Sequence, residues 1–358
     1  MEKWTKEKAW SWYDSLPWIR GFNFVPSIAL NKIEMWQEYG WEKMRDCIES
    51  ELSLAKDWGF NSIRVGLPLE LYIDDKKVLL EHLEEFLGIA WKHGIYTMIY
   101  FAGDCLVQKH DYHWPKYGPQ PFDLGYHSGT AISPHVVLPG PGYTIIDEPE
   151  YEAKFYDMVD EVVAKYAKDK RILLWDIWNE PGNSHRGMKS WPYIEKAFAV
   201  ARSHDPIQPC SADAWSFSDD HPLPEIERKA LEASDVITYH CYHHYEGNVK
   251  VAEALKTEYG RPMMNTEWLH RIWHCDVKEL FPYFRKERIG CFNWGFVTGK
   301  SQTREPWEWL FNEMDKGNGA DWDMEKWQHD LVRANHRPYS PEEYRIIKEE
   351  CLKADKGE

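Results

Sequence analysis

The sequence predicts an α/β protein that folds as a single (β/α)8 barrel, a TIM barrel. Short β-rich runs alternate with amphipathic helical stretches, eight such units can be counted, and no linker or low-complexity tract divides the 358 residues. Barrels of this kind reach about 250 residues or more as one domain. We therefore expect one domain over residues 1–358, with residues 1–18 as an N-terminal helical segment packed on the barrel.

The eight expected strands are short and rich in residues that favour extended structure. They cover residues 19–25, 62–66, 96–101, 173–178, 209–214, 236–241, 262–266 and 290–296. The 3.6-residue spacing of apolar positions predicts intervening helices, of which the clearest cover residues 41–58, 77–93, 150–168 and 277–287.

Glycine recurs where a helix is expected to end and the next strand to begin. Gly59, Gly94, Gly260 and Gly290 occupy such junctions, where a left-handed C-cap stops a helix. The first expected strand is followed by Asn-Phe-Val-Pro-Ser at residues 23–27, without the glycine-rich phosphate loop of doubly wound folds. Both observations favour the closed barrel.

Two connections are too long for plain turns. They run over residues 104–147, after the third strand, and residues 298–341, after the eighth. Both leave the C-terminal ends of strands, where a barrel carries its active site. We expect these loops to form walls of a pocket.

Composition and charge exclude several classes of function. Lys and Arg number 43 against 59 Asp and Glu, which gives a net charge of −16. An acidic surface repels phosphate backbones and anionic lipids, so we expect neither nucleic acid nor a membrane as a partner. The seven cysteines are scattered and the N-terminus shows no signal-peptide pattern, which predicts free thiols and a cytoplasmic location. The sequence leaves the oligomeric state open.

The strongest chemical signal is a pair of glutamates on two expected strands. Residues 173–181 read Leu-Leu-Trp-Asp-Ile-Trp-Asn-Glu-Pro, and residues 262–268 read Pro-Met-Met-Asn-Thr-Glu-Trp. On the fourth and seventh strands of one barrel, Glu180 and Glu267 both reach the mouth. Glycosidic cleavage requires two opposed carboxyl groups, one to protonate the leaving oxygen and one to attack or to activate water.

This combination resembles the clan A retaining glycoside hydrolases, in particular the family 5-like cellulase and mannanase group, over nearly the whole barrel. The resemblance implies that Glu180 is the acid/base and Glu267 the nucleophile of a double displacement on a carbohydrate with a β-glycosidic bond. It also implies substrate-binding roles for Arg64, Asn179, His240, Tyr242 and Trp294.

The implied roles differ between these five residues. Arg64 should keep the nucleophile ionised, and Asn179 should contact the sugar 2-hydroxyl. His240 should lie near the acid/base and Tyr242 near the nucleophile. Trp294, at the end of the eighth strand, should form the floor of the subsite that holds the sugar whose glycosidic bond is cleaved.

The mechanism predicts different pKa values for the two glutamates. Arg64 and hydrogen bonds should keep Glu267 anionic, whereas burial and the charge of Glu267 should raise the pKa of Glu180. Retention requires the carboxyl groups to lie about 5–5.5 Å apart, and inversion about 6.5–9.5 Å.

The long loops suggest a closed pocket and exo-action on a terminal sugar of a small glycoside or oligosaccharide. The candidate pocket residues of these loops are Asp104, His110, His113, Trp114, His127 and His135 in the first loop, and Lys300, Gln302, Trp307 and Trp309 in the second. Among these, Lys300 and Gln302 are candidate contacts for sugar hydroxyls.

The sequence leaves three alternatives open. A metal-dependent barrel hydrolase would use the histidines of residues 110–113 and 240–244, but the first strand lacks a His-x-His pair and HExxH is absent, so we expect no metal and no cofactor. A carbohydrate-binding barrel without activity would not need both glutamates. A transglycosylase would use the same residues as a hydrolase. The sugar and the linkage do not follow from the sequence.

Tryptophan is unusually frequent, with 20 residues. One group is expected at the barrel mouth, where indole rings stack on sugars: Trp178, Trp215, Trp268, Trp273, Trp294, Trp307 and Trp309. A second group is expected to pack the N-terminal segment across the base of the barrel: Trp4, Trp10, Trp12 and Trp18.

Overall fold

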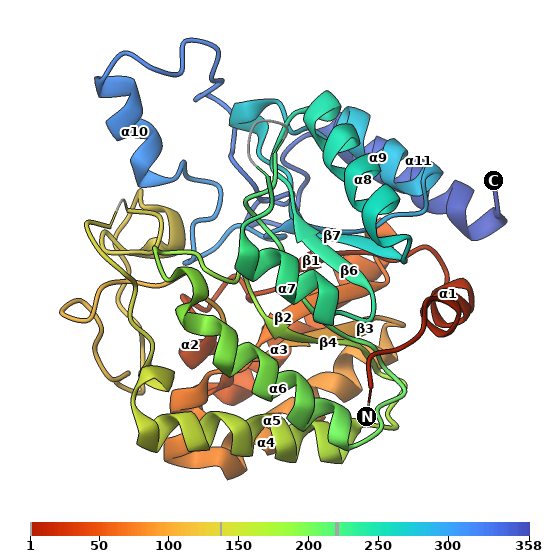
Figure 1. Cartoon of the computed structure of the whole chain (residues 1–358). Helices are drawn as coiled ribbons and strands as arrows, with labels where there is room; N and C mark the ends of the chain where they lie inside the picture. The colour runs from red at the N-terminus through yellow and green to blue at the C-terminus, as the bar shows by residue number, and fades with distance from the viewer. Residues whose placement is uncertain (1, 137, 219–221) are drawn as a thin grey trace.

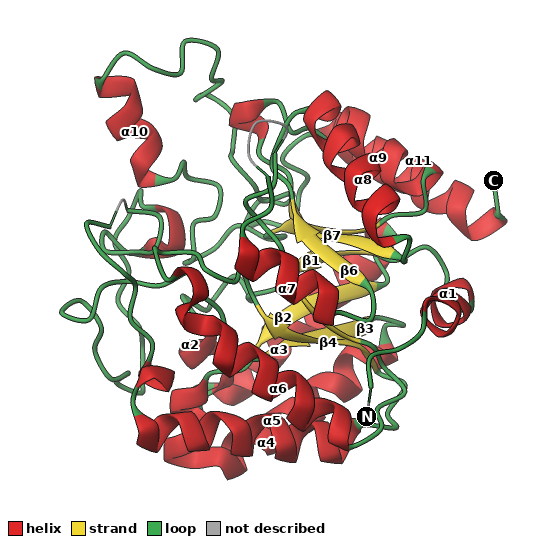
Figure 2. Ribbon diagram, viewed as in Figure 1, coloured by secondary structure: helices red, strands yellow, loops and turns green. Residues whose placement is uncertain are grey.

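The computed structural model describes residues 2–136, 138–218 and 222–358. In these residues, eight parallel strands form a nearly closed barrel in the order β5-β4-β3-β2-β1-β8-β7-β6 (Figure 2). They are β1 (Arg20–Asn23), β2 (Ser62–Gly66), β3 (Tyr96–Tyr100), β4 (Ile172–Trp178), β5 (Cys210–Ala212), β6 (Ile237–His240), β7 (Met263–Trp268) and β8 (Gly290–Trp294). Between β5 and β6, the carbonyl of Ala214 accepts from the His240 amide at 2.7 Å. The predicted (β/α)8 barrel is confirmed.

Helices surround the barrel and follow its strands in sequence (Figure 1). They are α1 (Lys6–Asp14), α2 (Lys32–Trp36), α3 (Trp41–Trp58), α4 (Leu69–Lys92), α5 (Pro149–Tyr166), α6 (Trp191–Ser203), α7 (Glu225–Ala233), α8 (Tyr245–Tyr259), α9 (Val277–Lys286), α10 (Glu308–Asp315) and α11 (Pro341–Lys356). None of these helices combines the length and the apolar character that a membrane crossing requires.

The expected elements agree closely with the observed ones, and α4 differs most. Its apolar spacing predicted a helix from residue 77, but α4 begins at Leu69 and contains a kink at Asp75, with φ −152° and ψ 71°. The kink breaks the helical period, so the turns before it carry a separate apolar face.

Three of the four glycine junctions have the predicted left-handed backbone. The φ angles are 96° at Gly59, 72° at Gly94 and 58° at Gly260. The prediction for Gly290 is wrong, because Arg288 takes the left-handed conformation, with φ 54°, and Gly290 opens β8. A Cβ at Gly290 would lie 2.7 Å from Cγ of Met264 on the neighbouring strand, so close packing explains the glycine.

The N-terminal segment packs on the base of the barrel. Trp4, Ala9 and Tyr13 form one buried cluster with residues from the first halves of the strands, such as Met98 and Leu174. Figure 1 shows α1 on the opposite side of the barrel from α10 and the long loops. The mouth is therefore formed by the loops that leave the C-terminal ends of the strands.

The tryptophans expected at the base do not all behave alike. Trp4 is buried, and Trp12 packs against the same cluster. Trp18 belongs instead to the main core, where its ring meets Phe281 at 5.1 Å. Trp10 is 40% exposed, so the prediction that it packs at the base is only partly right.

Candidate active site

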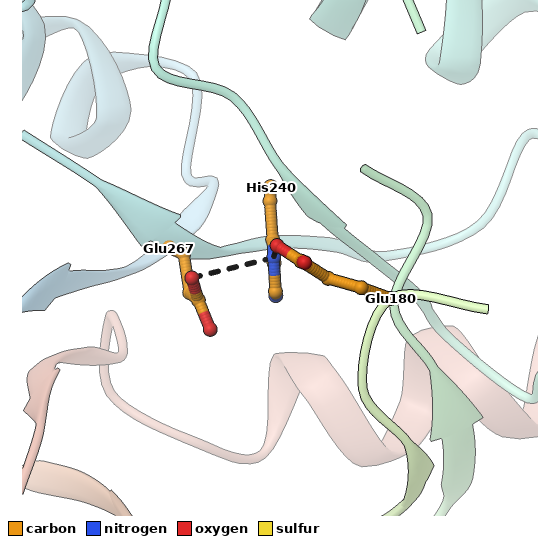
Figure 3. Close-up of side chains that lie close together, drawn as sticks. All are labelled: Glu180, His240 and Glu267. Atoms are coloured by element: carbon orange, nitrogen blue, oxygen red, sulfur yellow. Dashed lines mark hydrogen bonds and ion pairs between the residues drawn. The ribbon is translucent and has the colours of Figure 1, made fainter. Parts of the chain in front are cut away.

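The two glutamates lie side by side at the mouth of the barrel. Glu267 is in β7, and Glu180 follows β4 by two residues. Both are nearly buried, with 9% of Glu180 and 6% of Glu267 exposed. The imidazole Nδ1 of His240, at the end of β6, lies 2.7 Å from Oε1 of Glu180 and 3.4 Å from Oε2 of Glu267 (Figure 3). One oxygen of each carboxyl group lies within 4.8 Å of the other.

The backbone at Glu180 is held in an unusual conformation. Its φ angle is 50°, in the left-handed region that non-glycine residues rarely adopt. The next turn is fixed by Asp104, whose Oδ2 accepts from the Gly182 amide at 2.7 Å and whose Oδ1 accepts from Ser190 Oγ at 2.8 Å. Burial raises the pKa of Asp104 to about 6, against the opposing charge of Arg186. Asp104 thus anchors the turn that presents Glu180.

Arg64 connects the strands beneath the two glutamates. Its guanidinium is fully buried and donates five hydrogen bonds of 2.6–2.9 Å, to Asn23, Asp176, Asn179, Asp213 and Glu267. The five N–H groups of an arginine are therefore all used. The ring of Tyr100 covers the guanidinium at 4.7 Å, and Gly66 opposite it makes room, because a Cβ there would lie 2.2 Å from Cζ of Tyr100.

The electrostatics of Glu267 differ from the expectation. Burial raises the pKa of this carboxyl group, while His240, Arg64 and a hydrogen bond from Tyr242 Oη at 2.8 Å oppose the rise. Arg64 and the hydrogen bond act in the expected direction, but burial and the nearby charge of Glu180 outweigh them. The nucleophile candidate therefore depends on three donors together.

The structure brings six of the seven predicted site residues into one contact network. Asn179 accepts from Arg64 at 2.6 Å, and the other members are Glu180, Glu267, His240 and Tyr242. Trp294 is half-buried at the end of β8, beside Asn23 of β1, and so lies at the mouth.

Two tryptophans assigned to the mouth belong to the core. Trp178 is fully buried between Phe155 and Tyr193, on the helices outside the barrel. Trp268 is 1% exposed and packs on Phe281 and Phe284 of α9. These side chains point away from the barrel axis, so they do not contribute to a sugar site. The others are half-buried in the connections that follow the strands: Trp215, Trp273 and Trp307 in loops and short turns, and Trp309 in α10.

The two long loops are joined to each other. Gln302 accepts from the Gly125 amide at 2.8 Å and donates to the Asp123 carbonyl at 2.7 Å, and His127 Nδ1 contacts the Glu305 carbonyl at 2.8 Å. The expectation that Gln302 is free to bind a sugar is wrong, because its side chain is 1% exposed and engaged in these contacts. Lys300 is likewise occupied, by an ion pair with Glu34 at 2.5 Å.

The remaining residues of the first loop are less central. His110 and His113 are exposed, and Trp114 donates to Asp74 at 2.7 Å. His135 is half-buried and stacks on Trp307 at 5.8 Å. Of the histidines expected of a metal-dependent hydrolase, His240 lies between the two glutamates, and the others are exposed: His110, His113, His243 and His244.

A cluster of histidine and tryptophan rings, which we call the histidine cluster, lies next to Tyr242. Its members come from three loops of the mouth and are His127, His270, His329 and Trp307. The Trp307 ring meets Tyr242 at 5.3 Å. Within the described residues, Nε2 of His127, both ring nitrogens of His270 and Nε1 of Trp307 have no hydrogen-bond partner. His270 and His329 could not be identified from the sequence, since no spacing connects them to the first long loop.

Glu180, His240 and Glu267 could together hold a metal ion, because one ligand atom of each lies within 4.8 Å of the others. Their present arrangement is also complete without one, since His240 bridges the carboxyl groups directly. Two carboxyl groups this close match the spacing of a double displacement on a glycosidic bond rather than the wider spacing of inversion. Fold and site together define a carbohydrate-cleaving barrel.

The sequence matches the cellulase family, glycosyl hydrolase family 5, over residues 20–299. The chain therefore belongs to glycosyl hydrolase family 5, and it is a retaining glycoside hydrolase. A search of curated proteins gives no match.

Solved structures share the fold at low sequence identity. GH5_18 from Streptomyces cattleya, in complex with GlcNAc, has a TM-score of 0.59 at 12% identity, over 94% of this chain and 80% of that chain. A variant of GH5_18 from Bifidobacterium longum, in complex with Manb1-4GlcNAc, has a TM-score of 0.56 at 13% identity, over 94% of this chain and 78% of that chain. The β-mannanase from the blue mussel Mytilus edulis has a TM-score of 0.52 at 15% identity, over 79% of this chain and 87% of that chain.

Proposed function

We propose that the protein cleaves β-glycosidic bonds with Glu180 as acid/base and Glu267 as nucleophile, and that it acts on the terminal sugar of small glycosides or oligosaccharides. The observation that carries the assignment is the pair of carboxyl oxygens within 4.8 Å, bridged by His240. This separation suits direct attack by a carboxylate and leaves no room for the water of an inverting enzyme.

The contacts suggest how each step proceeds. Glu267 attacks the anomeric carbon while the bond to the glycosidic oxygen breaks and Glu180 gives that oxygen its proton. Water then attacks the anomeric carbon, Glu180 takes the proton, and the carboxylate of Glu267 leaves. Arg64 and Tyr242 donate to that carboxylate at 2.9 and 2.8 Å, so they stabilise it before the first step and after the second.

The joined loops support exo-action. The contacts of Gln302 and His127 tie residues 123–127 to residues 302–305. Gly129 packs even closer, because a Cβ there would lie 2.3 Å from the Lys300 carbonyl oxygen. A long polysaccharide needs a cleft that is open at both ends, and two long loops joined to each other on the side of the barrel that carries the site favour a substrate that ends there.

The histidine cluster favours a neutral sugar. Burial lowers the pKa of His127 to about 4 and the pKa of His270 well below its usual range, so both rings are uncharged at neutral pH. Burial likewise lowers the pKa of His329 well below its usual range. The cluster therefore offers no cation to pair with the carboxylate of a uronic acid.

The test is a panel of aryl β-glycosides with gluco, galacto, manno, xylo and glucurono groups, together with mannosyl-β-1,4-N-acetylglucosamine and a long mannan. We expect turnover of one or two neutral glycosides, none of the glucuronide, release of single sugars, and loss of turnover in Glu267→Ala. Internal scission of the polymer at a comparable rate would contradict exo-action.

Two controls separate the alternatives. Addition of a chelator tests a metal at Glu180, His240 and Glu267, and we expect unchanged turnover. Product analysis with an added alcohol acceptor distinguishes transfer from hydrolysis, since both pass through the same covalent intermediate. The cytoplasmic location stays a prediction, which cell fractionation tests.

A further inference from the structure

Asp213 lies behind His240, on the side away from the glutamates. It follows β5 directly and is fully buried. Its Oδ2 lies 2.8 Å from Arg64 Nη2 and 3.6 Å from His240 Nε2, and its Oδ1 accepts from Thr266 Oγ1 at 2.8 Å. Its amide donates to the Trp178 carbonyl at 3.1 Å. The carboxylate is therefore fixed from three sides.

Both ring nitrogens of His240 face carboxylates. Nδ1 faces Glu180 at 2.7 Å and Glu267 at 3.4 Å, and Nε2 faces Asp213 at 3.6 Å without another partner among the described residues. A neutral imidazole has one unprotonated nitrogen, and its lone pair would point either at Asp213 or at Glu267, and also at Glu180 once Glu180 is ionised. Only the imidazolium avoids this repulsion.

We propose that Asp213 is a positioning residue that holds His240 doubly protonated between the two glutamates. The proposal rests on the proposed roles of Glu180 and Glu267. When Glu180 gives its proton to the leaving oxygen, its new negative charge lies 2.7 Å from Nδ1 of His240. The imidazolium stabilises this charge as it forms, and Asp213 keeps the imidazolium in place.

The charges around His240 support this state. Glu180, Asp213 and Glu267 face the ring from the ends of β4, β5 and β7, while Arg64 and Tyr242 contact those carboxylates. Burial by itself lowers the pKa of His240, but Glu267, Asp213 and Glu180 outweigh it and raise the pKa to about 10. Asp176, which also contacts Arg64, contributes little charge because burial and Asp213 raise its pKa well above the usual range.

The test compares Asp213→Asn with Asp235→Asn. Asp235 is a matched control, since it is buried, pairs with Arg202 at 2.8 Å and accepts from the amides of Trp4 and Cys210 at the base of the barrel. Both variants should lose thermal stability. Only Asp213→Asn should lower kcat, by about tenfold or more, with KM within about threefold.

The pH profile distinguishes positioning from general destabilisation. Removing the negative charge of Asp213 lowers the pKa of His240 and favours deprotonation of Glu180. Both effects move the basic limb of kcat to lower pH, by about one unit, whereas Asp235→Asn should keep the wild-type limb. The proposal would be overturned if Asp213→Asn had the same kcat as the wild type and the same basic limb in its pH profile.

A measurement on the wild type does not depend on how Asp213→Asn folds. Nitrogen-15 NMR of the histidine rings at pH 8 should show one ring with both nitrogens protonated, and this signal should vanish in His240→Gln. A neutral His240 at pH 8 would overturn the proposal. If the proposed function is wrong, Glu267→Ala retains turnover. That outcome is separate from the NMR result, which is measured on the wild type.

Discussion

Arg64→Lys is the most informative single substitution in the buried network. The guanidinium donates five hydrogen bonds, whereas an ammonium group has three N–H groups, so at least two buried acceptors lose their partner. A hydrogen bond to a charged group contributes about 1.5–3 kcal/mol. We therefore expect the free energy of unfolding to fall by about 3–6 kcal/mol, and kcat to fall with it because Glu267 loses a fixed donor.

Urea unfolding at pH 7, followed by tryptophan fluorescence, measures the stability change. Arg202→Lys is the control, because Arg202 is also buried but makes its hydrogen bonds from Nη2 alone, to Ala233 and Asp235, and one ammonium nitrogen can replace them. We expect a loss below about 1.5 kcal/mol in this control. A loss below about 1 kcal/mol in Arg64→Lys would refute the reasoning, since two unpaired buried acceptors cannot cost so little.

Three further predictions follow from the site and its loops. First, His270 is neutral in the folded protein, because burial lowers its pKa, and it is protonated in the unfolded chain below about pH 6.5, so its contribution to stability is lost as the pH falls. Between pH 6.5 and 5 the wild type should lose about 2 kcal/mol more unfolding free energy than His270→Gln, and parallel stability curves would contradict this. Second, Gln302→Ala removes both contacts of this side chain between the long loops, so proteolysis within residues 104–147 and the rate on long chains relative to short ones should each rise severalfold, while the exposed His113→Ala should change neither. Third, Glu180→Ala should lose about 10²–10⁴-fold in rate on glycosides with poor leaving groups and much less on aryl glycosides that need no proton, and equal losses on both would remove Glu180 from the role of acid.

The sequence predicted the placement of the chemistry well, for a physical reason. Parallel strands present their C-terminal ends at one face, so a polar residue that ends a hydrophobic run must lie at the mouth of a barrel. Glu180, Glu267 and His240 all end such runs, and the structure places them within contact distance. The expected boundaries of β2 agree with the observed ones, since the apolar run and its flanking turns define them.

The side chains that the sequence placed wrongly lie next to irregular pairing. Asp176 points into the barrel toward Arg64, and strict alternation would place Trp178 on the same side. The register between β4 and β5 shifts between these two residues, and Trp178 faces the helices instead. A bulge of this kind has no signature in a single sequence.

The parts of the site that depend on tertiary contacts were not visible in the sequence. Asp213 becomes a partner of His240 only because β5 and β6 are neighbours in the closed barrel. His127 and His270 both contact His329, because the first long loop is joined to the loop after β8. The raised pKa of Glu267 likewise follows from its burial in the closed barrel and from the nearby charge of Glu180, which no residue spacing reveals.

Covalent trapping tests the central claim most directly. A 2-deoxy-2-fluoro glycoside with a good leaving group, built on the sugar that the panel identifies, slows both steps but slows release of the enzyme-bound sugar more. Mass spectrometry of the intact protein and of its peptides should show one fluorosugar per chain, attached to Glu267, with no label in Glu267→Ala. A label on another residue, or rapid turnover of natural substrate by Glu267→Ala, would contradict the account.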